Sequence, residues 1–240
     1  SNFDFVKKIS KKDYDKLCQQ LIPLNFNNIS NIKFYYKQEF IKNKNIISKM
    51  RNFLIENINF KNNDKNLVIT NLLEINYQLQ DKYKFDSQLF QHEEMTLESY
   101  NLGLKKLKNP YIYYSEDNIN KLLKNNERKY DNILLKLNEL NINNYYHYFI
   151  LTKIPNLILL VTSALQQIKK GGTIYFFIRV GQINNSLKKI FYLLSNSFEK
   201  YDIKNAKSSS YLLILKDFKD SVSEATLEKL RKICLKTRPY

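Results

Sequence analysis

Glycine and proline are scarce in this sequence, and tryptophan is absent. The 240 residues include 4 glycines, 4 prolines and 2 methionines, and arginine is rare beside lysine. Loops that cradle phosphates need closely spaced glycines, because the backbone must approach the ligand there. The sequence contains no Walker-type loop, no nucleophile elbow and no HExxH zinc motif, which argues against the enzyme classes built on them.

Cysteine and histidine are equally sparse. Cys18 and Cys234 lie near opposite ends of the chain, and His92 and His147 are far apart, so no group has the spacing of a zinc site. We therefore expect no metal. Two cysteines without a signal peptide indicate a reducing, cytoplasmic location. Because the chain starts with Ser1 and not Met, we also expect the natural protein to be longer.

Long hydrophobic runs are missing as well. The longest one spans residues 154–161 and is interrupted by Pro155 and Asn156. A membrane helix requires about 18 apolar residues or more. We therefore expect no contact with a membrane.

Positive charge is what the chain has in excess. Lysine and arginine number 39 against 23 acidic residues, which gives a net charge of +16. Such a charge favours RNA or another polyanion as a partner. AT-rich codons are an alternative cause, because they enrich Lys, Asn, Ile and Tyr without selection for binding. Arginine, the better bidentate ligand for phosphate, is rare here.

The hydrophobic fraction of 43% and the aromatic fraction of 14% are typical of a globular chain with one core. Apolar residues recur at helical spacing up to Pro23 and again between Phe40 and Phe60, before a turn cluster at 62–64. We therefore predict a helical N-terminal extension, residues 1–62, packed on an α/β domain, residues 63–240.

Strand and helix patterns alternate from residue 63 onward. Strands are predicted at 67–70, 111–114, 131–135 and 173–180, and a hairpin at 201–207 and 211–215. Helices are predicted at 85–107, 119–123, 155–168, 187–195 and 226–235. Lysines and glycines at 169–172 indicate a helix end, and the run at 173–180, apolar on both faces, indicates a central strand. The fold class is α/β, with a mainly parallel Rossmann-like sheet, a C-terminal antiparallel hairpin and a helical N-terminal segment.

The most specific pattern starts at Ala164. It reads A-L-x-x-I-K-K-G-G, then T-I-Y-F-F-I-R, then a helix ending in S-F-E-K, then K-N-A-K-S-S-S-Y-L-L-I-L-K-D-F-K. This order resembles the second half of the FtsJ-type RNA 2′-O-methyltransferases, and Lys129 to Leu134 is similar to the strand before it. The resemblance implies the class I S-adenosylmethionine-dependent methyltransferase fold, with its Rossmann-like methyltransferase sheet.

Members of that family use a Lys-Asp-Lys-Glu tetrad, which positions a ribose hydroxyl and lowers its proton affinity for attack on the cofactor's methyl group. The resemblance places the acid at Lys136, the second lysine at Arg179 and the glutamate at Ser209. The first lysine would lie in the helix before the first strand, where Lys49 is available. Lys136 reverses the charge, and an arginine is effectively never deprotonated. We therefore assign no catalytic residue.

The family's cofactor site normally includes a glycine-rich turn after the first strand. Here that strand runs into Thr70 to Asn76 without a glycine. The glycines lie elsewhere in the chain, at Gly103, Gly171, Gly172 and Gly181. We therefore expect no cofactor and no cofactor-binding residue.

These features favour a catalytically degenerate FtsJ-like domain. It would act as an RNA-binding or scaffold and stimulatory subunit, with a protein partner, in an RNA capping, modification or translation complex. Because ligands sit at the carboxyl ends of strands in this architecture, we expect RNA contacts at Arg179, Lys204, Lys207 and Lys136.

Two alternatives stay open. One is an active, divergent RNA (cap) 2′-O-methyltransferase that uses S-adenosylmethionine. The other is an unrelated α/β protein–protein interaction domain. A large DNA virus with an AT-rich genome would be one source of such a chain, and its location would then be the host cytoplasm.

Overall fold

The computed structural model describes residues 44–70, 79–91, 112–113, 123–124, 127–136, 146–179, 185–206 and 210–237. The helical patterns predicted before residue 40 and most of that at 119–123 lie outside these residues. Among the described residues no helix is long and apolar enough to cross a membrane.

A single sheet organises the described part of the chain. It has seven strands in the order β3-β2-β1-β4-β5-β7-β6. The pairs from β3 to β5 are parallel, and β7 runs antiparallel to both β5 and β6. The strands are β1 Asn66–Thr70, β2 Asp86–Gln91, β3 Ile112–Tyr113, β4 Tyr130–Lys136, β5 Ile168–Arg179, β6 Phe198–Ala206 and β7 Ser210–Phe218. The predicted α/β class, with a mainly parallel sheet and a C-terminal antiparallel hairpin, is confirmed.

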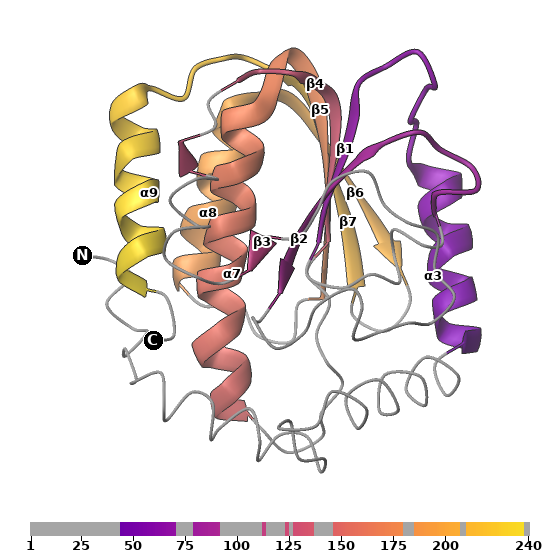
Figure 1. The fold of residues 1–240 in the computed structure, drawn as a ribbon, viewed down its shortest axis with the longest axis horizontal. Helices are drawn as coiled ribbons and strands as arrows, with labels where there is room; N and C mark the ends of the chain where they lie inside the picture. Colours follow the sequence, from indigo (N-terminus) through magenta and orange to yellow (C-terminus); the bar gives the residue numbers. More distant parts are fainter. Residues whose placement is uncertain are drawn as a thin grey trace.

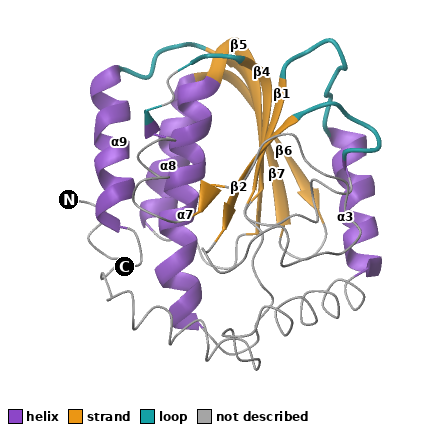
Figure 2. Cartoon of the chain, in the orientation of Figure 1, coloured by secondary structure: helices purple, strands orange, loops and turns teal. Residues whose placement is uncertain are grey.

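Helices cover both faces of the sheet (Figures 1 and 2). Helices α7 Tyr146–Gln167, α8 Asn185–Ser197 and α9 Glu224–Thr237 lie on one side, and α3 Lys44–Asn57 lies on the other. Strand residues alternate between the two sides, as the pleat requires. Ile133 and Phe176 therefore face the core under α7 and α8, whereas Leu134 and Phe177 face the core under α3.

Strand β5 lies between β4 and β7, and its residues Ile174 to Ile178 are buried. The prediction of a central strand at 173–180 is confirmed over 173–179. The end of the helix predicted at 155–168 agrees with the structure to one residue, since α7 ends at Gln167, but residues 169–172 already belong to β5, which begins at Ile168. The lysines and glycines form an irregularity at the start of this strand, where the register with β4 shifts.

Two further predictions of helices are corrected. The stretch predicted as a helix over 85–107 contains the strand β2. Its Gln88 lies between sheet and helix and exchanges hydrogen bonds with Gln167 of α7, so a polar residue points inward where the pattern suggested a surface. Helix α7 begins at Tyr146 and not at Pro155, which lies inside it. Pro155 has no backbone N–H to donate within the helix, and the helix tolerates this loss because its residues from Leu157 onward are buried in the core.

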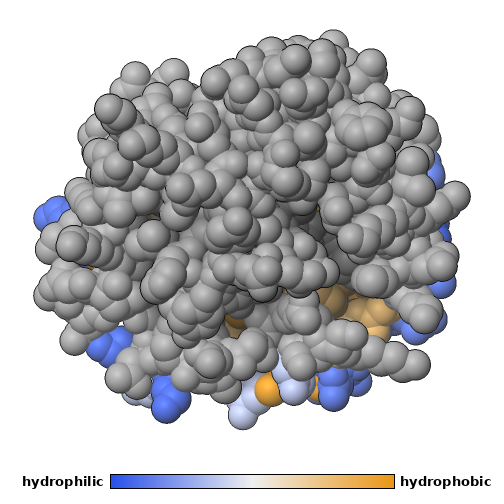
Figure 3. All heavy atoms as spheres, turned by 90° about the horizontal axis from the view of Figure 1, so that it is seen from below, coloured by the Kyte–Doolittle hydropathy of each residue, from blue (hydrophilic) through white to orange (hydrophobic). Residues whose placement is uncertain are grey.

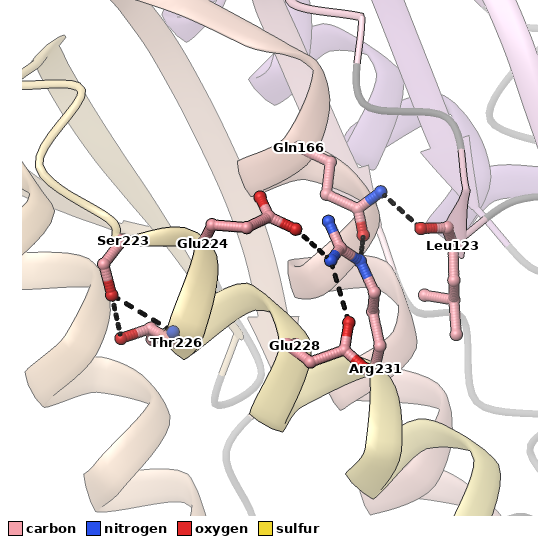
Figure 4. Close-up of polar contacts among 7 residues, drawn as sticks. All are labelled: Leu123, Gln166, Ser223, Glu224, Thr226, Glu228 and Arg231. Atoms are coloured by element: carbon pink, nitrogen blue, oxygen red, sulfur yellow. Dashed lines mark hydrogen bonds and ion pairs between the residues drawn. The ribbon is translucent and has the colours of Figure 1, made fainter.

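Helix α9 is fixed to α7 by a polar cluster on its inner side (Figure 4). The guanidinium of Arg231 pairs with Glu224 and, at 3.1 Å, with Glu228 on the same helix. Its Nε also donates to Gln166 Oε1 at 3.3 Å, and Gln166 Nε2 donates to the carbonyl of Leu123 at 3.1 Å. The largely buried side chains of Arg231 and Gln166 thus both have polar partners, as stable packing requires.

Candidate ligand-binding edge of the sheet

The carboxyl ends of the parallel strands meet at one edge of the sheet. The register places Thr70 of β1 opposite Lys136 of β4, and Lys136 opposite Phe177 of β5. In open α/β sheets this edge is where ligands bind. In the view from below, the described residues that reach the surface form a rim in which hydrophilic residues flank apolar ones (Figure 3).

Lys136 is the central cation of this edge. Its residue is only 6% exposed, and its Nζ lies 4.2 Å from the centroid of the Phe177 ring. Both residues face α3, since Phe177 also makes an edge-on contact with Phe53 of that helix at 6.1 Å between centroids. An aromatic face attracts an ammonium group, and this attraction grows when water is excluded. The ammonium group of Lys136 is therefore held against an apolar wall.

The contact between Lys136 and Phe177 cannot be predicted from the sequence. The two residues are far apart in the chain, and only the register between β4 and β5 brings them together. No local sequence pattern predicts the register between β4 and β5. The RNA-binding role of Lys136 stays a prediction.

The remaining predicted RNA contacts cluster at the same edge as far as they are described. Arg179, the last residue of β5, is paired with Ser210 of β7, and Ser210 is paired with Ala206 of β6. Adjacent strands lie about 4.8 Å apart, so the ends of β5 and β6 are separated by about two such steps. Lys204 lies in β6 just before that end, and Lys207 lies outside the described residues.

Lys204 is exposed but has a carboxylate partner. Its Nζ lies 3.2 Å from Asp202 Oδ2, with about half of each side chain exposed. The hydrogen bond from Lys204 lowers the pKa of Asp202, so the pair is charged at neutral pH. An exposed pair of this kind contributes little to stability and opens at small cost. Lys204 can therefore turn to a phosphate ligand.

The opposite edge, at the amino ends of the strands, is tied by structural contacts. Asp131, the acid of the segment similar to the FtsJ strand, accepts a hydrogen bond from the backbone N–H of Lys65 at 2.8 Å. Its other oxygen lies 3.5 Å from Lys169 Nζ. Asp131 therefore holds the start of β4 against β1 and β5 and is not part of the ligand-binding edge.

The tetrad positions are only partly brought together. Lys136 and Arg179 end the neighbouring strands β4 and β5, and Lys49 lies in α3, the helix before β1. Ser209 and the turn 71–76 after β1 lie outside the described residues. Among the described residues, no group of three His, Cys, Asp or Glu is placed to hold a metal ion.

No family model and no curated protein matches this chain. Solved structures do match. They include a ribosomal RNA methyltransferase from Plasmodium falciparum, with 16% identity and a TM-score of 0.45 over 72% of this chain and 96% of the other.

Human methyltransferase-like protein 13, in complex with SAH, matches with 12% identity and a TM-score of 0.43 over 82% and 91% of the two chains. An O-methyltransferase from Thermotoga maritima matches with 11% identity and a TM-score of 0.46 over 71% and 65%. At these values no residue and no activity is transferred from them.

The strand order and the antiparallel last pair define the class of fold. Five parallel strands followed by a reversed β7 between β5 and β6 form a Rossmann-like methyltransferase sheet. The chain is therefore a methyltransferase-like domain in its fold.

Proposed function

We propose that the chain is a catalytically degenerate FtsJ-like methyltransferase domain. It binds RNA at the carboxyl edge of its sheet and serves as a scaffold or stimulatory subunit beside a protein partner. The complex it joins would act in RNA capping, modification or translation.

One observation carries this proposal: Lys136 occupies the end of β4, the position that the resemblance assigns to the catalytic acid. The residue is 6% exposed and its ammonium lies against the ring of Phe177. A carboxylate there would accept a proton or a hydrogen bond from the ribose hydroxyl, whereas an ammonium only donates. The group expected to accept a proton at this position is thus replaced by one that only donates.

The same edge suits a polyanion. Lys136, Arg179 and Lys204 belong to three strands whose carboxyl ends lie at this edge, with β7 between β5 and β6, and the whole chain carries a net charge of +16. Phosphate contacts of this kind supply affinity without a base-specific code. RNA binding therefore does not require that methyl transfer survives.

The test reverses two predicted contacts at once. The double variant Lys204→Glu with Lys207→Glu should bind a single-stranded RNA oligonucleotide more weakly than the unchanged chain. The log–log slope of affinity against salt should fall by roughly 1.4, because each lost contact with a single strand removes about 0.7.

A matched control separates the site from the overall charge. Lys229 and Lys232 are exposed on α9, away from this edge, and their double reversal to Glu makes the same change in net charge. It should leave most of the affinity intact. Equal losses in the two double variants, or an unchanged affinity and slope in the first, would contradict the proposed site.

An active, divergent RNA 2′-O-methyltransferase is the second candidate. The observation in its favour is the position of Lys49 in α3, which covers the same face of the sheet as Lys136. Methyl transfer from S-adenosylmethionine to a capped RNA, lost in the Lys49→Ala variant, would establish this candidate and exclude the first.

A further inference from the structure

Strand β6 ends the sheet, and its outer side carries no strand among the described residues. It is nine residues long and pairs only with β7 there. Every residue from Glu199 to Asn205 is exposed, so neither face of its middle part is covered. A long open edge of this kind is a template for an additional strand.

The backbone of β6 shows which groups point outward. The N–H of Ile203 donates to Asp202 Oδ1 at 2.8 Å. Ile203 thus turns its N–H away from the ladder with β7, and by alternation Tyr201 and Asn205 do the same. Asp202 therefore occupies an outward N–H in the middle of the edge, and its other oxygen lies 3.2 Å from Lys204 Nζ. Because the ion pair between Asp202 and Lys204 is exposed, an incoming strand can displace it at small cost.

The two faces of the edge differ in character. On the side of α8, Tyr201 is 63% exposed and Ile203 is 56% exposed, and on α8 itself Tyr192 is 73% exposed. These are the exposed large hydrophobic residues of the described part. On the other face, Lys200 of β6 stands directly opposite Lys216 of β7. Like charges in such a pair are destabilising. Asp202 is the one acidic residue of β6 on this face, and it already pairs with Lys204, so it offsets the charge of the lysines only in part.

We propose that the outer edge of β6 binds an extended segment of an acidic protein partner as an additional strand. The segment alternates apolar residues, which cover Tyr201 and Ile203, with carboxylates, which neutralise Lys200 and Lys216. A second copy of this chain fits poorly, because it would bring another net charge of +16 to a lysine-rich edge. This interface goes beyond the proposed RNA binding, and among the predicted RNA contacts it involves only Lys204, whose ion pair with Asp202 the partner strand would displace.

The probe is a fluorescent nine-residue peptide of alternating glutamate and valine, titrated with the 240-residue chain and followed by anisotropy. A peptide of the same composition with its glutamates grouped at one end is the control, because it cannot place all carboxylates on one face. We expect the alternating peptide to bind at least about tenfold more tightly than the grouped one.

Two variants locate the site. Asn205→Pro removes an outward N–H, which an edge strand tolerates, and should weaken binding about tenfold relative to Asn205→Ala. Lys200→Glu should weaken it by a similar factor, while Lys229→Glu on α9 should change it little. Thermal unfolding of each variant checks that the fold is intact, and Lys200→Glu keeps the test decisive if the proline variant unfolds.

Three results would overturn the proposal. They are equal binding of both peptides, equal effects of Lys200→Glu and Lys229→Glu, and sedimentation that shows a dimer broken by Asn205→Pro. RNA affinity measured on the same variants distinguishes this interface from the proposed function. Loss of peptide binding in Lys200→Glu with RNA affinity no lower than in Lys229→Glu supports a separate surface.

Discussion

Gly172 illustrates how one residue sets the geometry at the start of β5. A Cβ built there would lie 2.7 Å from Ile168 Cδ1 and 2.9 Å from the backbone oxygen of Asp131. The side chain of Ile168 has some freedom, but the carbonyl of Asp131 is held in the sheet. Gly171 beside it has open space around its Cβ position and a φ of +79°. The two glycines are therefore required for different reasons.

The variant Gly172→Ala should lower the free energy of unfolding by about 2 to 3 kcal/mol, since the strand must shift to relieve the clash. Gly171→Ala should cost about 1 kcal/mol, the penalty of a left-handed backbone alone. Urea unfolding followed by circular dichroism measures both. A loss for Gly172→Ala no larger than that for Gly171→Ala would show that β4 and β5 are not packed this closely.

The residues that stand out in the sequence, the glycine pair and Lys136, also stand out in the structure. The pattern predicts a helix that ends just before the two glycines, and α7 does end at Gln167, but the glycines themselves belong to β5. A glycine pair marks unusual backbone, but the pattern does not tell a helix end from a strand irregularity. Lys136 is buried because Phe177 and α3 enclose it, and both are brought there by the register and not by neighbours in the chain.

Arg128 connects elements that are distant in the sequence. Its NH1 donates to the carbonyls of Leu165 at 2.8 Å and Ile168 at 3.1 Å, where α7 passes into β5. Its Nε lies 3.1 Å from Asp220 Oδ1, and its guanidinium carbon lies 5.0 Å from the centroid of Phe218. One side chain thus caps the end of α7 and fixes the end of β7 beside it.

Replacing Arg128 by glutamine should therefore lower the free energy of unfolding by about 2 to 3 kcal/mol, because two buried carbonyls lose a charged donor. Its neighbour provides the control. Lys129 is half exposed, and its ion pair with Asp86 at 3.9 Å is long, so Lys129→Gln should change stability by less than about 0.5 kcal/mol. Similar Tm values for the two variants would mean that Arg128 does not join these elements.

The elements themselves are predictable from the sequence to different degrees. Runs such as Leu67 to Thr70 and Thr173 to Ile178 are apolar on both faces, and this pattern is typical of a buried strand. Strand β2 is not predicted from the sequence because polar residues, Ser87 and Gln88, point inward where a buried strand usually has apolar ones. Gln88 is accommodated by hydrogen bonds to Ser163 and Gln167 of α7, which the periodicity of the sequence does not predict. The start of α7 is not predicted correctly because a proline such as Pro155 is typical of the first turn of a helix.

For the whole molecule, the class of fold is predictable from the sequence and the function is not. The alternation of strands and helices leads to a mainly parallel sheet, and the resemblance over the C-terminal part adds the antiparallel hairpin. The boundary between the parts 1–62 and 63–240 stays a prediction. In the described part, α3 packs on the sheet through Leu54 and Ile58. Net charge favours a polyanion without naming one, because the charge is spread over the entire chain.

The proposed function requires that the fold of a methyltransferase is kept here while its chemistry is lost. This requirement rests on Lys136 at the end of β4 and on the turn after β1, which contains no glycine. Both features concern the edge of the sheet at which the methyl donor would bind. Binding of the donor is therefore the property that separates a degenerate domain from an active enzyme.

Calorimetric titration of the chain with S-adenosylmethionine, together with thermal unfolding at 1 mM ligand, tests this loss of chemistry. We expect no binding heat and no shift of Tm. A dissociation constant near 10 μM would instead stabilise the fold by about 2.7 kcal/mol at this hundredfold excess, which a melting curve resolves easily. Such a stabilisation would contradict the proposed degenerate domain and favour the active methyltransferase.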